Sequence, residues 1–170
     1  MGQIARMLEV QVQYGIPRRG LPGVQRLHRA AQAAWQGGVA SAQVTLRIVD
    51  AAEGQALNAR FRGQDKPTNV LSFPAEAFDL PQASELLGPT YLGDIVLCAP
   101  VLAAEAEAQG KSLAAHYVHM VVHGLLHLQG FDHDTTAQAQ IMEALECDIL
   151  ASLGYPDPYQ ALACTIESGD

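Results

Sequence analysis

Cysteine is scarce in this chain of 170 residues, and the few cysteines are poorly spaced for pairing. Cys98, Cys147 and Cys164 are odd in number and far apart in sequence, and they form no Cys-x-x-Cys pair. This pattern argues against the disulfide framework of small secreted proteins. We therefore expect unpaired thiols in a reducing cytoplasm.

The sequence also lacks a long apolar run. No stretch approaches the about 18 consecutive apolar residues of a membrane span. The first residues, Met1 to Glu9, lack the apolar core of a signal peptide, and Arg6 breaks the pattern for N-myristoylation. These absences predict a cytoplasmic protein with no membrane partner.

The length and the 49% hydrophobic composition suit a single domain with an ordinary core. We place this domain at residues 1–154, because no usable motif follows Gly154. Residues 155–170 are interpreted as a C-terminal tail, and the sequence leaves open whether this tail is flexible.

Positive charge is in short supply, with 10 Lys and Arg against 18 Asp and Glu, for a net charge of −8. Nine of the ten basic residues lie before position 67, where only four acidic residues oppose them. Charge neutralisation of a polyanion is local, on a scale of about 8–10 Å. Two interpretations stay open: a basic face built from the first 66 residues, or a drift in surface composition without function.

Histidine, by contrast, is concentrated in one motif between positions 123 and 133. Residues four apart lie one turn apart on the same face of a helix, so His123 and His127 can reach one ion at about 2.0–2.1 Å. Gly130 can adopt the left-handed conformation that ends a helix, and the chain can then turn back to deliver His133 as a third ligand. Three protein ligands leave the fourth position of a tetrahedral ion for water, which is the catalytic arrangement.

Two further histidines, His116 and His119, continue the same stripe upstream. His119 and His123 are also four apart, but only the pair of His123 and His127 is followed by the turn that supplies a third ligand. We interpret His116 and His119 as lining the cleft or supporting the ligands. Three imidazoles prefer zinc but also suit nickel, cobalt or copper.

The same histidine spacing occurs in metzincin peptidases, where a glutamate general base directly follows the first histidine. Gly124 occupies that position here and cannot accept a proton. A glycine inside a helix costs about 1 kcal/mol relative to alanine, so either another group approaches closely or a buried helix tolerates it. Of the carboxylates beside His133, Asp132 is the better candidate for holding a ligand imidazole, and Asp134 suits the N-cap of the next helix.

These residues resemble the YbeY family, bacterial metal-dependent endoribonucleases of ribosomal RNA maturation. The family's run His-Gly-x-Leu-His-Leu-x-Gly-aromatic-Asp-His is matched throughout 123–133. A second block covers 57–63 and 65–74, and a third, Leu-Gly-Asp-Ile-Val, covers 92–96. The similarity extends from about residue 45 to residue 150, most of the chain.

The resemblance implies one zinc ion per chain on His123, His127 and His133, and cleavage of single-stranded RNA. It also implies that Arg62 lies in the cleft opposite the metal, so we take Arg62 and His123 as the catalytic residues. A guanidinium can bind two phosphoryl oxygens and stabilise charge as it develops, and Lys66 could hold the RNA backbone. The implied role is 3′ end processing of small-subunit ribosomal RNA and ribosome quality control. The implied partners are ribosomal RNA and ribosome or assembly proteins.

Two alternatives stay open at this point. One is a metallopeptidase-like hydrolase of metzincin spacing, against which Gly124 argues. The other is a non-catalytic, zinc-containing ribosome assembly factor. The residues name no general base and do not decide between attack by water and attack by a ribose hydroxyl.

Periodicity and capping residues predict an α+β fold. We expect a small mixed β-sheet of about four strands, packed with about five helices, and a metal site on the histidine helix facing a cleft. The expected strands are 8–14, 43–49, 70–73 and 95–99. The expected helices are 22–36, 51–61, 100–110, 112–129 and 135–153, with a loop at 74–90.

Overall fold

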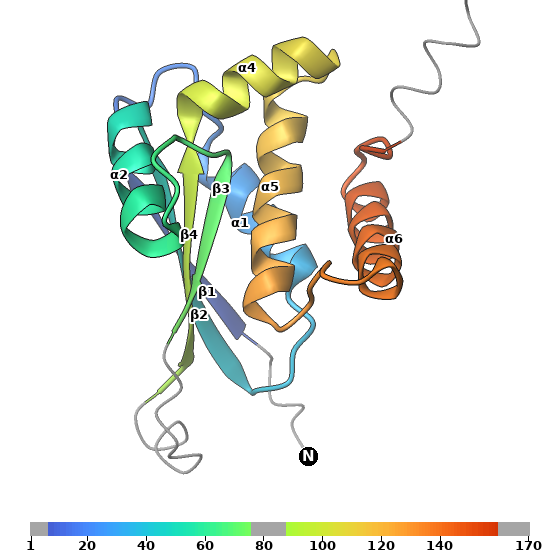
Figure 1. Ribbon diagram of the computed structural model, residues 1–170. Coiled ribbons are helices and arrows are strands. Elements are labelled where there is room, and N and C mark those ends of the chain that lie inside the picture. The colour runs from blue at the N-terminus through green and yellow to red at the C-terminus, as the bar shows by residue number, and fades with distance from the viewer. Residues whose placement is uncertain (1–6, 76–87, 160–170) are drawn as a thin grey trace, which may run out of the picture.

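The computed structural model describes residues 7–75 and 88–159. In these residues it contains four strands and five helices, which confirms the α+β class (Figure 1). In chain order they are β1 (Met7–Tyr14), α1 (Val24–Ala34), β2 (Ser41–Val49), α2 (Ala51–Arg62), β3 (Val70–Pro74), β4 (Thr90–Cys98), α4 (Ala99–Gln109), α5 (Leu113–Leu128) and α6 (Thr136–Ser152).

The four strands form one mixed sheet with the order β1-β2-β4-β3. β1, β2 and β4 are parallel, and β3 is antiparallel to β4 at one edge. Successive side chains of β4 alternate between two buried layers, with Ile95 and Leu97 on one side and Val96 and Cys98 on the other. The centre of the sheet is therefore covered on both faces.

Helices cover the two faces unequally. α1 and α5 pack on one face and enclose the larger core, while α2 packs on the opposite face over a small cluster (Figure 1). This smaller cluster consists of Val49, Leu71, Val96 and Cys98, with Leu57 of α2 against it. α6 packs on the outer side of α5 (Figure 1).

The central element is α5, which contacts α1, α4, α6, β3 and β4. Ten of its 16 residues are buried, as expected of a helix that is apolar nearly all round. The histidines of α5 are therefore placed by a rigid, well-packed helix.

Within 7–75 and 88–159, no helix combines the length and apolarity needed to cross a membrane.

Most predicted boundaries are confirmed within two residues, because their caps are local. Asp50 and Ser112 accept hydrogen bonds from the first turns of α2 and α5, and Gly110 ends α4. The prediction of Asp134 as an N-cap was wrong. Thr135 caps α6, forming a reciprocal capping box with Gln138.

The start of β4 was also mispredicted, by five residues. Thr90 pairs with Ala42 of β2, and the ladder continues through a bulge to Gly93, which has φ +140°. A Cβ at Gly93 would lie 2.2 Å from the carbonyl oxygen of Phe73, so only glycine allows β3 to approach. Most of the predicted loop, residues 76–87, lies outside the described residues.

Candidate metal centre and cleft

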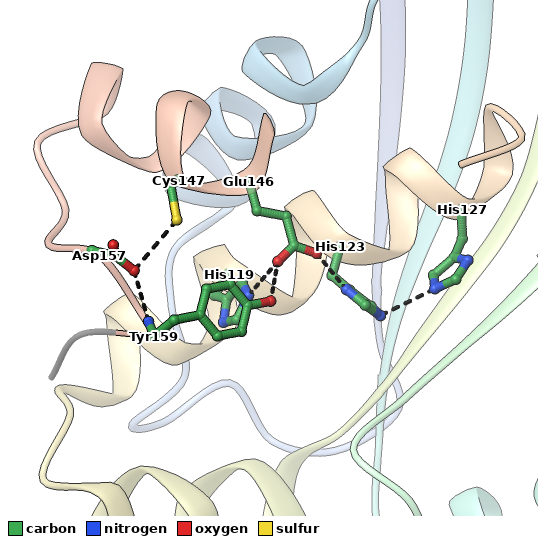
Figure 2. Close-up of polar contacts among 7 residues, drawn as sticks. All are labelled: His119, His123, His127, Glu146, Cys147, Asp157 and Tyr159. Carbon is green, nitrogen blue, oxygen red and sulfur yellow. Dashed lines mark hydrogen bonds and ion pairs between the residues drawn. The ribbon is translucent and has the colours of Figure 1, made fainter. Parts of the chain in front are cut away.

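The histidine helix brings two ring nitrogens together as its spacing predicts. The Nε2 atoms of His123 and His127 lie 3.1 Å apart on α5 (Figure 2). Gly130 has φ +97° and turns the chain so that the His133 ring comes within 5.0 Å, centroid to centroid, of the His127 ring. One ligand atom from each of the three histidines lies within 4.8 Å of the others, so this group could hold a metal ion.

The dimensions and chemistry of this group suit zinc. Two nitrogens bound to one tetrahedral zinc at about 2.0–2.1 Å are roughly 3.4 Å apart, close to the separation of the two Nε2 atoms. Burial, and then the neighbouring His123 and His133, lower the pKa of His127. Its neutral form, which binds metals, is therefore favoured at neutral pH.

The two upstream histidines lie outside this group. His119 Nε2 is 3.0 Å from an oxygen of Glu146, and His116 Nε2 is 3.5 Å from an oxygen of Glu105. Neither ring lines the cleft at the metal group. The pairing of His119 with His123 as ligands is therefore not what the fold assembles, whereas a supporting role fits His119.

A cleft of about 770 Å³ opens beside the three histidines. It lies between the end of α2, β3 and the turn after α5, and both Arg62 and Lys66 line it. Arg62 Nη2 donates a hydrogen bond to the carbonyl oxygen of Ser72, 2.9 Å away. Arg62 and the three imidazoles therefore line the same cleft.

Among the described residues, Glu146 of α6 contacts an imidazole of this group, with a carboxylate oxygen 2.5 Å from His123 Nδ1 (Figure 2). Asp132, the residue favoured from sequence, instead accepts the backbone N–H of His133 at 2.8 Å. That hydrogen bond is the main reason why the pKa of Asp132 is lowered. Glu146 carried one sequence signal, since it continues the buried stripe of Met142, Ile149 and Leu150.

Gly124 is explained by close packing. A Cβ at this position would lie 2.9 Å from Ile95 Cγ2 and 3.1 Å from Ser72 Oγ. Glycine therefore lets α5 approach the sheet next to the histidines. The interpretation as close approach is confirmed over simple tolerance.

The basic residues do not gather at the cleft. Arg26 and Arg29 of α1 line a different depression, beside Leu153, and Arg47 pairs with Glu53 at 2.8 Å. Among the residues that the structure describes, the lysine and arginine side chains lining the cleft are Lys66 and Arg62. The positive charge of the first 66 residues is thus divided among several surfaces.

Comparison with known proteins identifies the family. A family model described as Endoribonuclease YbeY matches residues 23–154. The chain is 50% identical over 153 residues to Endoribonuclease YbeY of Stenotrophomonas maltophilia strain K279a, covering 89% of this chain and 93% of that protein. It is 51% identical, with the same coverage, to the protein of that name from Xanthomonas oryzae pv. oryzae strain MAFF 311018.

A solved structure resembles the fold. The solution structure of a protein from Thermotoga maritima aligns with a TM-score of 0.54 at 22% identity, covering 85% of this chain and 91% of that one. At this identity the similarity supports the fold alone. The family match over residues 23–154 and the two relatives of about 50% identity lead to one conclusion: the chain belongs to the YbeY family of endoribonucleases.

Proposed function

We propose that this protein is a zinc-dependent endoribonuclease that cleaves single-stranded ribosomal RNA. The observation that carries the proposal is a single cleft lined by Arg62 together with His123, His127 and His133. The family of the chain supports cleavage of RNA rather than of peptides. Gly124, with no group to accept a proton, also disfavours the metzincin mechanism.

The three histidines would hold one zinc ion through their ring nitrogens. When bound, zinc supplies Lewis acidity, which polarises phosphoryl oxygens and lowers the pKa of water. The chain would hold the histidines in place before zinc binds, because α5 is rigidly packed and burial favours a neutral His127 ring.

Arg62 would bind the phosphate that is cleaved. Its contact with Ser72 uses one of five guanidinium N–H groups, so others remain to donate to two phosphoryl oxygens at once. These contacts strengthen as negative charge builds up on the phosphate in the transition state. Lys66 would hold a neighbouring phosphate as a point charge.

We place the reaction in the cytoplasm, on the 3′ end of small-subunit ribosomal RNA and in ribosome quality control, with ribosome or assembly proteins as partners. The unpaired thiols of Cys98 and Cys147 are consistent with a reducing compartment, while Cys164 lies outside the described residues. The domain boundary at residue 154 remains a prediction.

The decisive experiment compares two arginines of α2. Arg62→Ala should lower kcat on a single-stranded RNA oligonucleotide by about 10²- to 10³-fold, with zinc content and thermal unfolding unchanged. Arg60→Ala removes the same charge two residues away, from an exposed side chain that does not line the cleft. It should leave kcat within about twofold of the wild-type value.

Retention of RNA cleavage by both Arg62→Ala and His127→Ala would refute the proposal and point to a contaminating nuclease. A protein that binds zinc at the three histidines but never cleaves RNA would instead be the non-catalytic assembly factor. Peptide cleavage lost in His127→Ala would revive the peptidase.

A further inference from the structure

Glu146 is fully buried on α6 and accepts hydrogen bonds from three side chains (Figure 2). Its Oε1 lies 2.5 Å from His123 Nδ1, and its Oε2 lies 3.0 Å from His119 Nε2. The hydroxyl of Tyr159 donates to the same Oε2. One carboxylate thus links a histidine of the metal group to a buried histidine and to the segment that follows α6.

The contacts of the two Glu146 oxygens indicate which nitrogen of His123 carries the hydrogen. Within the described part of the chain, Oε1 accepts from no other side chain, and it lies 2.5 Å from His123 Nδ1, so a hydrogen on Nδ1 completes this hydrogen bond. The other nitrogen of that ring, Nε2, then carries the lone pair, and it lies 3.1 Å from His127 Nε2.

The segment after α6 is held in place by its own contacts. Asp157 accepts the backbone N–H of Tyr159 at 2.8 Å and the Cys147 thiol at 3.3 Å (Figure 2). The Tyr159 ring packs edge-on against the His119 ring, with centroids 5.6 Å apart. Tyr159 therefore reaches Glu146 from an anchored backbone.

A general need to neutralise a buried charge does not by itself explain this geometry. Two donors, His119 and Tyr159, already converge on Oε2, yet the other oxygen is directed at His123. His123 is only partly buried and borders the cleft. The carboxylate is thus held from behind by two groups and presents its second oxygen to the metal group.

We propose that Glu146 is a positioning residue that holds His123 in the tautomer and orientation needed to bind the metal, and that Tyr159 keeps Glu146 in place. This inference rests on the metal site proposed above. Carboxylates that accept the second ring N–H of a ligand histidine fix its tautomer and increase its basicity.

The test is zinc affinity, measured by competition with a chromophoric chelator. Glu146→Gln keeps the shape of the side chain but loses the charge, and it should weaken zinc binding by about 10- to 100-fold. Glu143→Gln makes the same change on an exposed residue of the same helix. It should leave zinc affinity within about twofold of the wild-type value.

A second readout distinguishes positioning from a merely structural role. Nitrogen-15 spectra of the imidazoles in metal-free protein report which nitrogen of His123 carries the hydrogen. Wild-type protein should show the Nδ1–H form, and Glu146→Gln should show a mixture of the two tautomers. An unchanged tautomer with unchanged zinc affinity would overturn the inference.

Tyr159→Phe keeps the inference testable if Glu146→Gln does not fold. It removes one hydroxyl and should weaken zinc binding by roughly two- to tenfold, and full wild-type affinity would count against the role of Tyr159. His127→Ala separates the two proposals. Wild-type zinc affinity in His127→Ala would refute the metal site itself. Loss in His127→Ala with retention in Glu146→Gln would refute only the positioning role.

Discussion

At the scale of single residues, Gly124 occupies a position where close packing leaves no room for a side chain. Alanine would improve helix propensity by about 1 kcal/mol. Its Cβ, however, would meet Ile95 Cγ2 at 2.9 Å, a distance that real Cβ contacts essentially never show. Ile95 is fully buried in β4, so it has little room to move. Because position 124 has no side chain, α5 can pack closely against the sheet, and His123 lies correspondingly close to it.

We predict that Gly124→Ala destabilises the protein despite its better helix propensity. Overpacking of a tight core costs about 1–3 kcal/mol and the propensity gain offsets about 1 kcal/mol, so the free energy of unfolding should fall by up to roughly 2 kcal/mol. Urea denaturation measures this loss. The control is a cycle with Ile95→Ala, in which the double variant should lose less than the sum of the single losses. Strict additivity would show that Ile95 is not the group in the way.

The metal group and its support differ in how far sequence could predict them. His123, His127 and His133 are joined by one helix and one turn, so local geometry alone brings them together. Glu146 lies 23 residues beyond His123, on a different helix, and its contact depends on how α6 packs on α5. The sequence favours Asp132 because it is adjacent to His133 and because Asp134 suits an N-cap. Because Asp132 directly precedes His133, its carboxylate instead accepts the backbone N–H of His133.

At the scale of elements, boundaries set by local signals could likewise be predicted from the sequence, whereas those set by tertiary packing could not. Asp50 and Ser112 marked helix starts correctly, because an N-cap depends on the next three residues. Gly93, in contrast, prevented a correct prediction of the first half of β4. A glycine suggests a break in a strand until the neighbouring backbone of Phe73 is known. Strand order likewise depends on contacts between distant segments.

The turn after α5 provides a prediction at this scale. Gly130 and Gly154 both follow helices with positive φ, +97° and +87°, and both have open space where a Cβ would lie. Gly130→Ala and Gly154→Ala should each lower stability by about 1–2 kcal/mol, through backbone strain alone. Only Gly130→Ala should also weaken zinc binding, because that turn delivers His133.

Thermal unfolding in the presence of chelator measures the strain in these two variants, and zinc titration measures the site. Gly154→Ala is the matched control, with the same substitution in the same kind of backbone. Equal effects of the two variants on zinc affinity would mean that the turn at Gly130 does not set the position of His133.

At the scale of the whole molecule, the net charge of −8 opposes the approach of RNA from a distance. Binding must then depend on a few local contacts. Arg62 and Lys66 line the cleft, whereas Arg29 lines a depression elsewhere. This distribution favours a small number of neutralised phosphates over the extended basic face that the sequence allowed.

The salt dependence of RNA binding tests this distribution. Each phosphate neutralised on a single strand contributes about −0.7 to the slope of log K against log salt concentration, so two cations predict a slope of about −1.4. Lys66→Ala should reduce it to about −0.7, while Arg29→Ala should leave it unchanged. Fluorescence anisotropy with metal-free protein, which keeps the RNA intact, measures the slope. A slope several times steeper, reduced by Arg29→Ala, would show that arginines outside the cleft also bind RNA, because only an additional neutralised phosphate steepens the line.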